Sequence, residues 1–158
     1  HAGVPVEYIR KAVKEFNAVE HRIEFVKEIS GVKYYNDSKG TNPDAAIKAV
    51  EAMVSPTVVI GGGYDKQASY DEWIASFGDK VKCLVLLGAT ADKIAASADK
   101  AGFTNIIKTD SLKEAVKAAS LNAKPGDAVL LSPACASWDM FKSYEERGTL
   151  FKEYVNSL

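Results

Sequence analysis

The chain has 158 residues, of which 47% are hydrophobic and 26% are charged, and its length suits one ordinary domain with one core. Its 20 basic and 21 acidic residues are scattered along the sequence, which argues against nucleic acid as the main partner. The sequence contains no run of eighteen or more apolar residues that could span a bilayer. Cys83 and Cys135 lack both metal-ligand spacing and disulfide density, so we expect reduced thiols in a cytoplasmic protein.

The first twenty residues begin with a helix-like pattern. Ile9, Val13 and Phe16 recur at helical spacing within residues 6–16. Such a helix normally packs on structure that precedes it, so we expect this chain to be the C-terminal piece of a longer protein.

An antiparallel hairpin is predicted next. Residues 22–29 and 32–35 are strand-like, and Ser30-Gly31 between them suits a two-residue turn. Pro43 then favours the first turn of a helix to about Met53, since the residue before a proline prefers an extended backbone.

From residue 57 onward, predicted strands alternate with predicted helices. The strands are residues 57–60, 82–87, 105–108 and 128–131, and the helices end near Phe77, Ala101 and Leu121. Helix starts are indicated by capping boxes at Ser69 with Glu72 and at Ser111 with Glu114, and by a cap at Thr90, with Gly102 as a stop signal. This alternation predicts an α/β fold. We expect a Rossmann-like three-layer domain with a mostly parallel, mixed sheet of about six strands, including the N-terminal antiparallel hairpin.

Polar residues and glycines follow three predicted strands, at residues 36–42, 61–66 and 132–147. Ligands in open α/β sheets bind at the carboxyl ends of the strands. We therefore expect all three segments to lie at the same edge of the sheet.

The first polar segment holds more polar groups than a turn needs. Thr41 or Asn42 suits the N-cap of the following helix, where backbone N–H groups hold anions well. A cap and a turn account for Asn42 and Pro43, but they leave Asp37 and Lys39 unexplained. A ligand site is one interpretation of this segment.

The second segment, Gly61-Gly62-Gly63 followed by Lys66, favours close approach of the backbone to a ligand and presents a cation. It matches neither GxGxxG nor GxxxxGK[ST], so it is no complete phosphate cradle. If the protein uses ATP, we expect most of that site to lie elsewhere.

The third segment combines small residues with the Ser137 hydroxyl, which favours binding of a carboxylate between the aromatic walls of Trp138 and Tyr144. Cys135 is a poor candidate nucleophile, because neither histidine lies near it in sequence. His21 is interpreted as structural rather than as a general base. The terminal helix is expected to pack through Phe141, Phe151, Tyr154 and Val155.

Four stretches together carry a family resemblance: HRIE at residues 21–24, GVKYYNDSKGTN at 31–42, GGGYDK at 61–66, and LSPACASWDMFKSYEERG at 131–148. Through them, residues 21–158 resemble the C-terminal domain of the Mur ligases, in the form that adds D-glutamate. Residues 1–20 look like the end of the family's central ATPase domain and its hinge.

The resemblance implies part of an ATP-dependent acid-D-amino-acid ligase of peptidoglycan synthesis. Such an enzyme joins D-glutamate to UDP-N-acetylmuramoyl-L-alanine through an acyl phosphate. Its Mg²⁺ ligands belong to the missing central domain and its sugar-nucleotide site to the missing N-terminal domain. We therefore expect no metal site in this chain, and no catalysis by the chain alone.

The resemblance also assigns roles to single residues. Arg22 would reach the ATP phosphates, Asp37 the ATP ribose, and Lys39 would line the same interdomain catalytic site. The D-glutamate ligands would be Thr41, Lys66, Ser137, the backbone of Trp138, and Tyr144.

Two alternatives remain open from the sequence. One is another amide ligase of the same superfamily, similar to folylpolyglutamate synthase. The other is a non-catalytic α/β regulatory module such as a phosphoacceptor receiver. A receiver needs an aspartate at the end of a central strand, whereas the strand at residues 82–87 is followed by Gly88-Ala89-Thr90.

Overall fold

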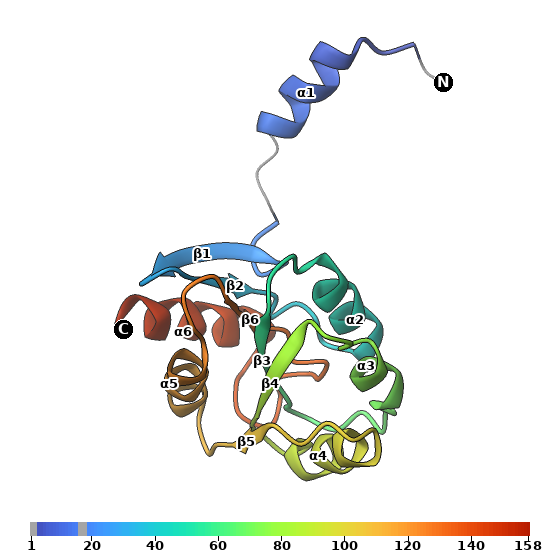
Figure 1. Cartoon of the computed structure of the whole chain (residues 1–158), viewed down its shortest axis with the longest axis vertical. Coiled ribbons are helices and arrows are strands. Elements are labelled where there is room, and N and C mark those ends of the chain that lie inside the picture. The colour runs from blue at the N-terminus through green and yellow to red at the C-terminus, as the bar shows by residue number, and fades with distance from the viewer. Residues whose placement is uncertain (1–2, 16–18) are drawn as a thin grey trace.

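The computed structural model describes residues 3–15 and 19–158 (Figure 1). In chain order its elements are α1 (Val6–Glu15), β1 (Glu24–Ile29), β2 (Val32–Asn36), α2 (Pro43–Ala52), β3 (Thr57–Gly61), α3 (Asp71–Ala75), β4 (Val81–Leu86), α4 (Ala91–Lys100), β5 (Ile106–Lys108), α5 (Leu112–Asn122), β6 (Ala128–Leu131) and α6 (Tyr144–Asn156). Among the described residues, no helix has the length and apolar character needed to cross a bilayer.

The six strands form one mixed sheet in the order β1-β2-β6-β3-β4-β5. β1 and β2 pair antiparallel as the predicted hairpin, and the other neighbours are parallel. Leu131 at the end of β6 lies opposite Asn36 of β2 on one side and Ile60 of β3 on the other. The carboxyl ends of these three strands are therefore side by side. The three polar segments start at that edge, as the sequence predicts.

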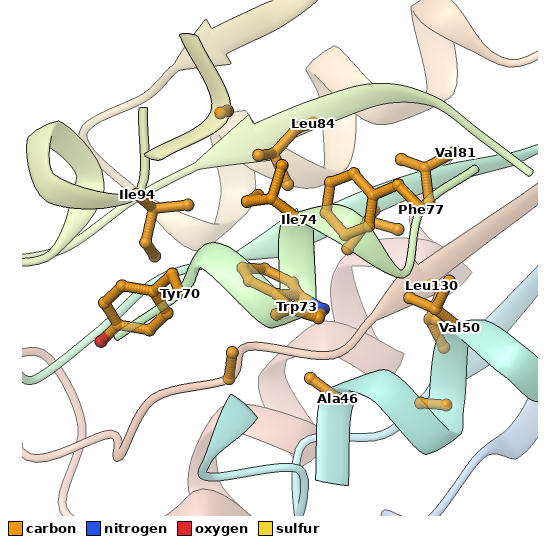
Figure 2. Packing of buried hydrophobic residues seen from close by; sticks show 14 of the residues in the cluster. Ala46, Val50, Tyr70, Trp73, Ile74, Phe77, Val81, Leu84, Ile94 and Leu130 are labelled. Atoms are coloured by element: carbon orange, nitrogen blue, oxygen red, sulfur yellow. The ribbon is translucent and has the colours of Figure 1, made fainter. Parts of the chain in front are cut away.

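Helices cover both faces of the sheet and divide the core into two clusters (Figure 1). One face packs against α2, α3 and α4, and its cluster includes Trp73, Phe77 and Leu130, all buried (Figure 2). The other face packs against α5 and α6 and includes Phe151 and Val155. Full burial of such a side chain contributes about 1.5–3 kcal/mol. The Rossmann-like three-layer fold is thus confirmed.

The predicted N-caps Asn42 and Ser111 are confirmed, and each bonds a backbone N–H three residues further along the chain. The Asn42 side chain accepts a hydrogen bond from the Ala45 N–H at 2.9 Å, and Ser111 accepts from the Glu114 N–H at 3.2 Å. The second half of that capping box differs, because the Glu114 carboxylate accepts from Asp110 rather than from Ser111. These contacts fix where α2 and α5 begin.

Of two other predicted caps, the one at Ser69 is wrong, and the one at Thr90 has the right position but no side-chain cap hydrogen bond. Helix α3 begins at Asp71 and ends at Ala75, and its N-cap is Tyr70, whose ring is buried in the core. Burial of that ring sets the start of the helix, and Ser69 only accepts from the Asp71 N–H at 3.3 Å. Thr90 does occupy the N-cap of α4, but its hydroxyl bonds Gly63 instead of capping the helix.

Helix α1 stands clear of the sheet in Figure 1. Its side chains Val6, Tyr8 and Ile9 are all more than half exposed. Phe16, which the sequence places on the same face, lies outside the described residues.

Candidate functional site

A cavity of about 290 Å³ opens at the carboxyl edge of the sheet. It is lined by Thr41, Lys66, Ala136, Ser137, Trp138, Ser143, Tyr144 and Glu145. The five residues to which the resemblance assigns the amino-acid ligand are all among them. They come from the segments after β2, β3 and β6, which are far apart in the chain and adjacent in the sheet.

Two further cavities differ in their relation to this site. A cavity of about 210 Å³ shares Thr41 and Lys66 with the first and continues toward Tyr70 and Cys135. The largest of the three, about 480 Å³, lies on α5 and α6 and includes Tyr154 in its lining. It contains none of the predicted site residues, so size alone does not identify the candidate site.

Two lysines lie over the aromatic walls of the 290 Å³ cavity. The Lys66 ammonium is 6.0 Å from the centroid of the Trp138 ring, and the Lys39 ammonium is 5.7 Å from that of Tyr144. Trp138 is 66% exposed and packs at 5.6 Å against the ring of Tyr64. Ring faces attract cations, which holds the Lys66 ammonium near Trp138 in the lining and the Lys39 ammonium near the Tyr144 ring. This arrangement suits a ligand with negative charge.

Ser137 presents a free donor to the same cavity. Its residue is only 1% exposed, and its carbonyl accepts from the Phe141 N–H at 2.8 Å. Within residues 3–15 and 19–158, no hydrogen bond engages the Ser137 hydroxyl or the backbone N–H of Trp138. A carboxylate readily accepts from such donors. Ser137 and Trp138 thus both line the cavity, and their convergence on a carboxylate stays a prediction.

Glu145 is the acidic side chain in the lining of this cavity. A hydrogen bond to Glu145 raises the pKa of the neighbouring Tyr144. The backbone N–H of Glu145 and the neighbouring Tyr144 hydroxyl lower the pKa of the Glu145 carboxyl group. The lining of the cavity thus contains one cation, Lys66, and one carboxylate at the start of α6.

Asp37 and Arg22 lie beside each other where β1 and β2 meet. Asp37 is 4% exposed; its Oδ1 accepts from the Ile23 N–H at 3.2 Å, and its Oδ2 accepts from the Ser132 hydroxyl at 2.8 Å. Burial raises the pKa of Asp37 to about 6, and these hydrogen bonds and the charges of Arg22 and Arg147 oppose the rise. Arg22 itself is exposed. The acid faces inward and the arginine faces solvent.

The glycine loop after β3 corrects one interpretation of the sequence. Gly62 and Gly63 have φ of +106° and +142°, and added Cβ atoms would lie 2.0 Å from the Leu87 carbonyl oxygen and 2.3 Å from that of Ala136. The loop thus packs closely on the protein's own backbone rather than leaving room for a ligand there. Its last residue, Lys66, is what reaches the cavity.

Arg147 is the main site residue whose role was missed. Its guanidinium, 2% exposed, donates to the Ser38 hydroxyl at 3.0 Å, to the Ser38 carbonyl at 2.9 Å and to the Cys135 carbonyl at 3.2 Å. Burial lowers its pKa to about 10, so it stays charged at neutral pH. It thereby ties together the segments after β2 and β6. Its spacing from Phe151 and Val155 on α6 places it on the buried face of that helix, which is the signal that would have revealed it.

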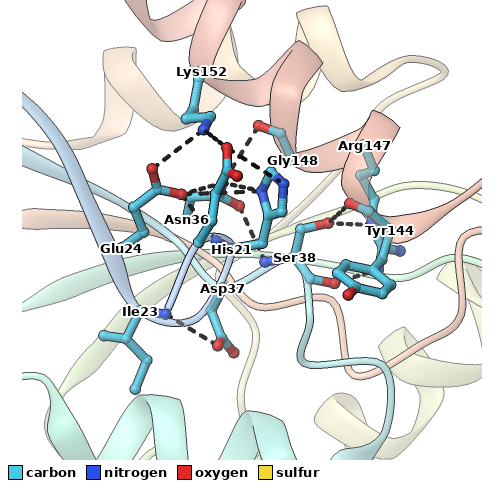
Figure 3. A network of polar contacts seen from close by, with 11 residues as sticks. His21, Ile23, Glu24, Asn36, Asp37, Ser38, Tyr144, Arg147, Gly148 and Lys152 are labelled. Atoms are coloured by element: carbon cyan, nitrogen blue, oxygen red, sulfur yellow. Dashed lines mark hydrogen bonds and ion pairs between the residues drawn. The ribbon is translucent and has the colours of Figure 1, made fainter. Parts of the chain in front are cut away.

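His21, interpreted from the sequence as structural, is 5% exposed and packs inside a polar network (Figure 3). Its Nδ1 lies 2.9 Å from the Asn36 amide nitrogen, which also donates to Glu24 at 3.1 Å. A Cβ added to Gly148 would lie 2.3 Å from the His21 ring. The ring therefore holds the end of β2 against α6.

The thiol of Cys135 is also structural. It contacts the Tyr70 hydroxyl at 3.1 Å and the Thr90 hydroxyl at 3.2 Å. Burial raises the pKa of Cys135, which disfavours the nucleophilic thiolate. These contacts fix Cys135 beside Tyr70, and both residues line the neighbouring 210 Å³ cavity.

One cluster in the described chain has the composition of a metal site, formed by Glu20, His21 and Glu24. The Lys152 ammonium donates to Glu20 at 2.6 Å and to Glu24 at 3.2 Å. The lysine occupies one oxygen of each carboxylate and offsets one of their two negative charges, and the other Glu24 oxygen accepts from the His21 N–H and the Asn36 amide, so the donor set does not fit a cation.

A mixed, helix-covered sheet with a polar cavity at its carboxyl edge defines an α/β domain of the Rossmann-like class. The profile of the family described as "Mur ligase, glutamate ligase domain" matches residues 21–135, more than half of the chain. The chain belongs to the Mur ligase family.

Curated relatives match nearly the whole chain. A UDP-N-acetylmuramoylalanine--D-glutamate ligase of Lachnoclostridium phytofermentans is 61% identical over 155 residues, which is 98% of this chain and 34% of the relative. One of the same name from Lachnospira eligens is 59% identical over 157 residues, or 99% and 35%. The chain thus spans about a third of the length of these relatives.

Solved structures share the fold at low identity. UDP-N-acetylmuramate-alanine ligase of Thermotoga maritima has a TM-score of 0.67 at 16% identity, covering 98% of this chain and 34% of that one. A bifunctional folylpolyglutamate synthase/dihydrofolate synthase of Yersinia pestis has a TM-score of 0.65 at 17% identity, covering 96% and 35%. These likenesses concern the fold alone.

Proposed function

We propose that residues 21–158 are the C-terminal, D-glutamate-binding domain of a cytoplasmic ATP-dependent ligase that joins D-glutamate to UDP-N-acetylmuramoyl-L-alanine in peptidoglycan synthesis. The observation that carries this proposal is the 290 Å³ cavity, whose lining includes all five residues expected to hold D-glutamate. The names and identities of the curated relatives support the same reaction.

In this proposal the cavity binds a dicarboxylate. Lys66 supplies a cation, while the Thr41 and Ser137 hydroxyls and the Trp138 N–H supply neutral donors. Charge-assisted hydrogen bonds of this kind are short and strong. Trp138 and Tyr144 form the walls, which orient the amine of D-glutamate toward the acyl phosphate of the other substrate. Positioning of this kind supplies a large part of the catalysis in a two-substrate reaction.

The nucleotide would lie next to this cavity, between this domain and the missing central domain. Arg22 is exposed and suits the ATP phosphates. Lys39 lies two positions before Thr41, which lines the cavity. The resemblance assigns Asp37 to the ATP ribose, but its carboxylate is 4% exposed and both of its oxygens already accept from protein donors, so we propose no direct ribose contact for it. ATP would supply the phosphoryl group that activates the alanine carboxylate.

Mg²⁺ would be held by the rest of the protein. In the described chain the one candidate metal cluster already has its two carboxylates bonded to the Lys152 ammonium. Residues 1–20 would end the central ATPase domain and form a hinge. The exposed apolar side chains Val6, Tyr8 and Ile9 support this assignment, because they suit a helix that packs on another domain.

The test is phosphate release by the full-length protein from ATP, Mg²⁺ and UDP-N-acetylmuramoyl-L-alanine. We expect release with D-glutamate and little or none with matched L-glutamate. A parallel reaction with L-glutamate and a folate tests the folylpolyglutamate synthase alternative. Release in that reaction, with none in the first, would contradict the proposal.

A further inference from the structure

Arg22 lies between two residues with an unusual backbone conformation. His21 has φ of +63° and Ile23 has φ of +46°. A left-handed backbone is uncommon for residues other than glycine and is a genuine outlier for a β-branched side chain. Such conformations persist only where the surroundings enforce them, and they cluster at functional sites.

The Ile23 side of the turn is enforced by Asp37. Its Oδ1 accepts from the Ile23 N–H at 3.2 Å, while its Oδ2 is fixed by the Ser132 hydroxyl at 2.8 Å. Ser132 follows β6, the neighbouring strand. The carboxylate thus links the residue after Arg22 to the middle of the sheet.

The His21 side of the turn is enforced by Asn36, the residue that precedes Asp37 in the chain. Its side-chain amide nitrogen lies 2.9 Å from His21 Nδ1 and also donates to Glu24 (Figure 3). The Glu24 carboxylate accepts from the His21 N–H at 3.0 Å, and the His21 carbonyl accepts from the Lys39 N–H at 3.0 Å. Both flanks of Arg22 are therefore tied to residues at the end of β2.

We propose that Asn36 and Asp37 form a clamp that fixes the strained turn at residues 21–23 and so positions Arg22 for the nucleotide phosphates. The inference rests on the proposed function and adds positioning roles to it. Through Lys39 the clamp connects the turn to the segment that carries Thr41, a residue of the amino-acid cavity. This link runs through the backbones of His21 and Lys39 and not through the Asp37 side chain.

A double-mutant cycle tests whether Asp37 acts through Arg22. In the full-length protein, the kcat and KM for ATP are compared for Arg22→Ala, Asp37→Ala and the double variant. We expect losses in kcat/KM of about 100-fold for Arg22→Ala and about 30-fold for Asp37→Ala, in the range for lost transition-state donors. The double variant should lose no more than about threefold beyond Arg22→Ala, because coupled residues are not additive. Losses that multiply would overturn the clamp.

Two further readouts separate positioning from a general structural role. In Asp37→Ala, the KM for D-glutamate should change less than about threefold; a rise as large as that for ATP would refute the proposal. Adding Ile23→Gly to Asp37→Ala should restore part of the activity, since glycine adopts a positive φ without strain. Ile23→Gly alone is the matched control.

Thermal melts show whether each variant is folded. If Asp37→Ala does not fold, Asp37→Asn carries the test, because it keeps an acceptor oxygen for the Ile23 N–H. It should lose less than about tenfold, and a loss equal to that of Arg22→Ala would contradict the clamp. Wild-type protein without D-glutamate-dependent phosphate release would refute the proposed function itself, whereas an active wild type with multiplicative losses would refute only the clamp.

Discussion

The guanidinium of Arg147 bonds both the carbonyl oxygen and the hydroxyl of Ser38, although 109 positions separate the two residues. The same group reaches the Cys135 carbonyl, and the Ser38 hydroxyl in turn donates to the Tyr144 carbonyl at 2.7 Å. Two segments that line the candidate site are thus held in register by one buried charge. Removal of Arg147 should therefore be felt both in stability and in the site.

Arg147→Met should lower the free energy of unfolding by about 3 kcal/mol, because it leaves buried carbonyl groups without a donor. Arg147→Lys should lose nearly as much, since one ammonium cannot replace three guanidinium nitrogens. Urea unfolding of the chain measures both, with the exposed Lys142→Met as a control. A loss below about 1 kcal/mol for both Arg147 variants would contradict the role of this residue.

Ser137→Ala should weaken D-glutamate binding and leave stability unchanged. The Ser137 hydroxyl has no protein partner in the described chain, so its removal costs only a ligand hydrogen bond. The KM for D-glutamate of the full-length protein should rise about tenfold, or ~1.4 kcal/mol. The matched control is Ser38→Ala, which removes a hydroxyl with two protein partners and should lower the melting temperature. The reverse pattern would show that Ser137 is structural.

Lys66→Ala should raise the KM for D-glutamate by roughly 10- to 100-fold, because a hydrogen bond to a charged group contributes ~1.5–3 kcal/mol. Lys93→Ala is the matched control. Lys93 pairs with Asp65, the residue before Lys66, but it lies outside the 290 Å³ cavity. Unchanged D-glutamate kinetics in Lys66→Ala would remove this lysine from the site.

Asp37 should make stability fall as the pH rises from about 4 to about 6. Burial raises its pKa from the ordinary 3.8 to about 6, so in this interval the folded chain binds a proton that the unfolded chain has released. Its stabilising contribution is complete below pH 4 and is lost as the pH rises through 6, by up to ~3 kcal/mol. Asp37→Asn should flatten the curve of unfolding free energy against pH. An identical curve for the variant would show that Asp37 does not titrate there.

The sequence predicted those features whose partners are close in the chain or follow from strand order. Asn42 and Ser111 cap their helices through residues three positions away, and the common edge of the polar segments follows from the parallel sheet. The resemblance predicted five residues of the 290 Å³ cavity, and the fold brings these residues together.

The errors have long-range causes. The Thr90 hydroxyl bonds Gly63, 27 positions away, and Tyr70 starts α3 because its ring is buried. Two features on which the sequence made no prediction also depend on distant partners: Ser132 holds the Asp37 carboxylate, and Ser38 bonds Arg147. Local pattern carries little information on such contacts, because tertiary packing decides them.

The central claim, that the 290 Å³ cavity is a D-glutamate site, is tested most directly by titration of the ¹⁵N-labelled 158-residue chain with D-glutamate, with L-glutamate as the control. We expect amide shifts at Thr41, Lys66 and Ser137 with D-glutamate and much smaller ones with the L form. No response at these residues, or an equal response to both forms, would contradict the account.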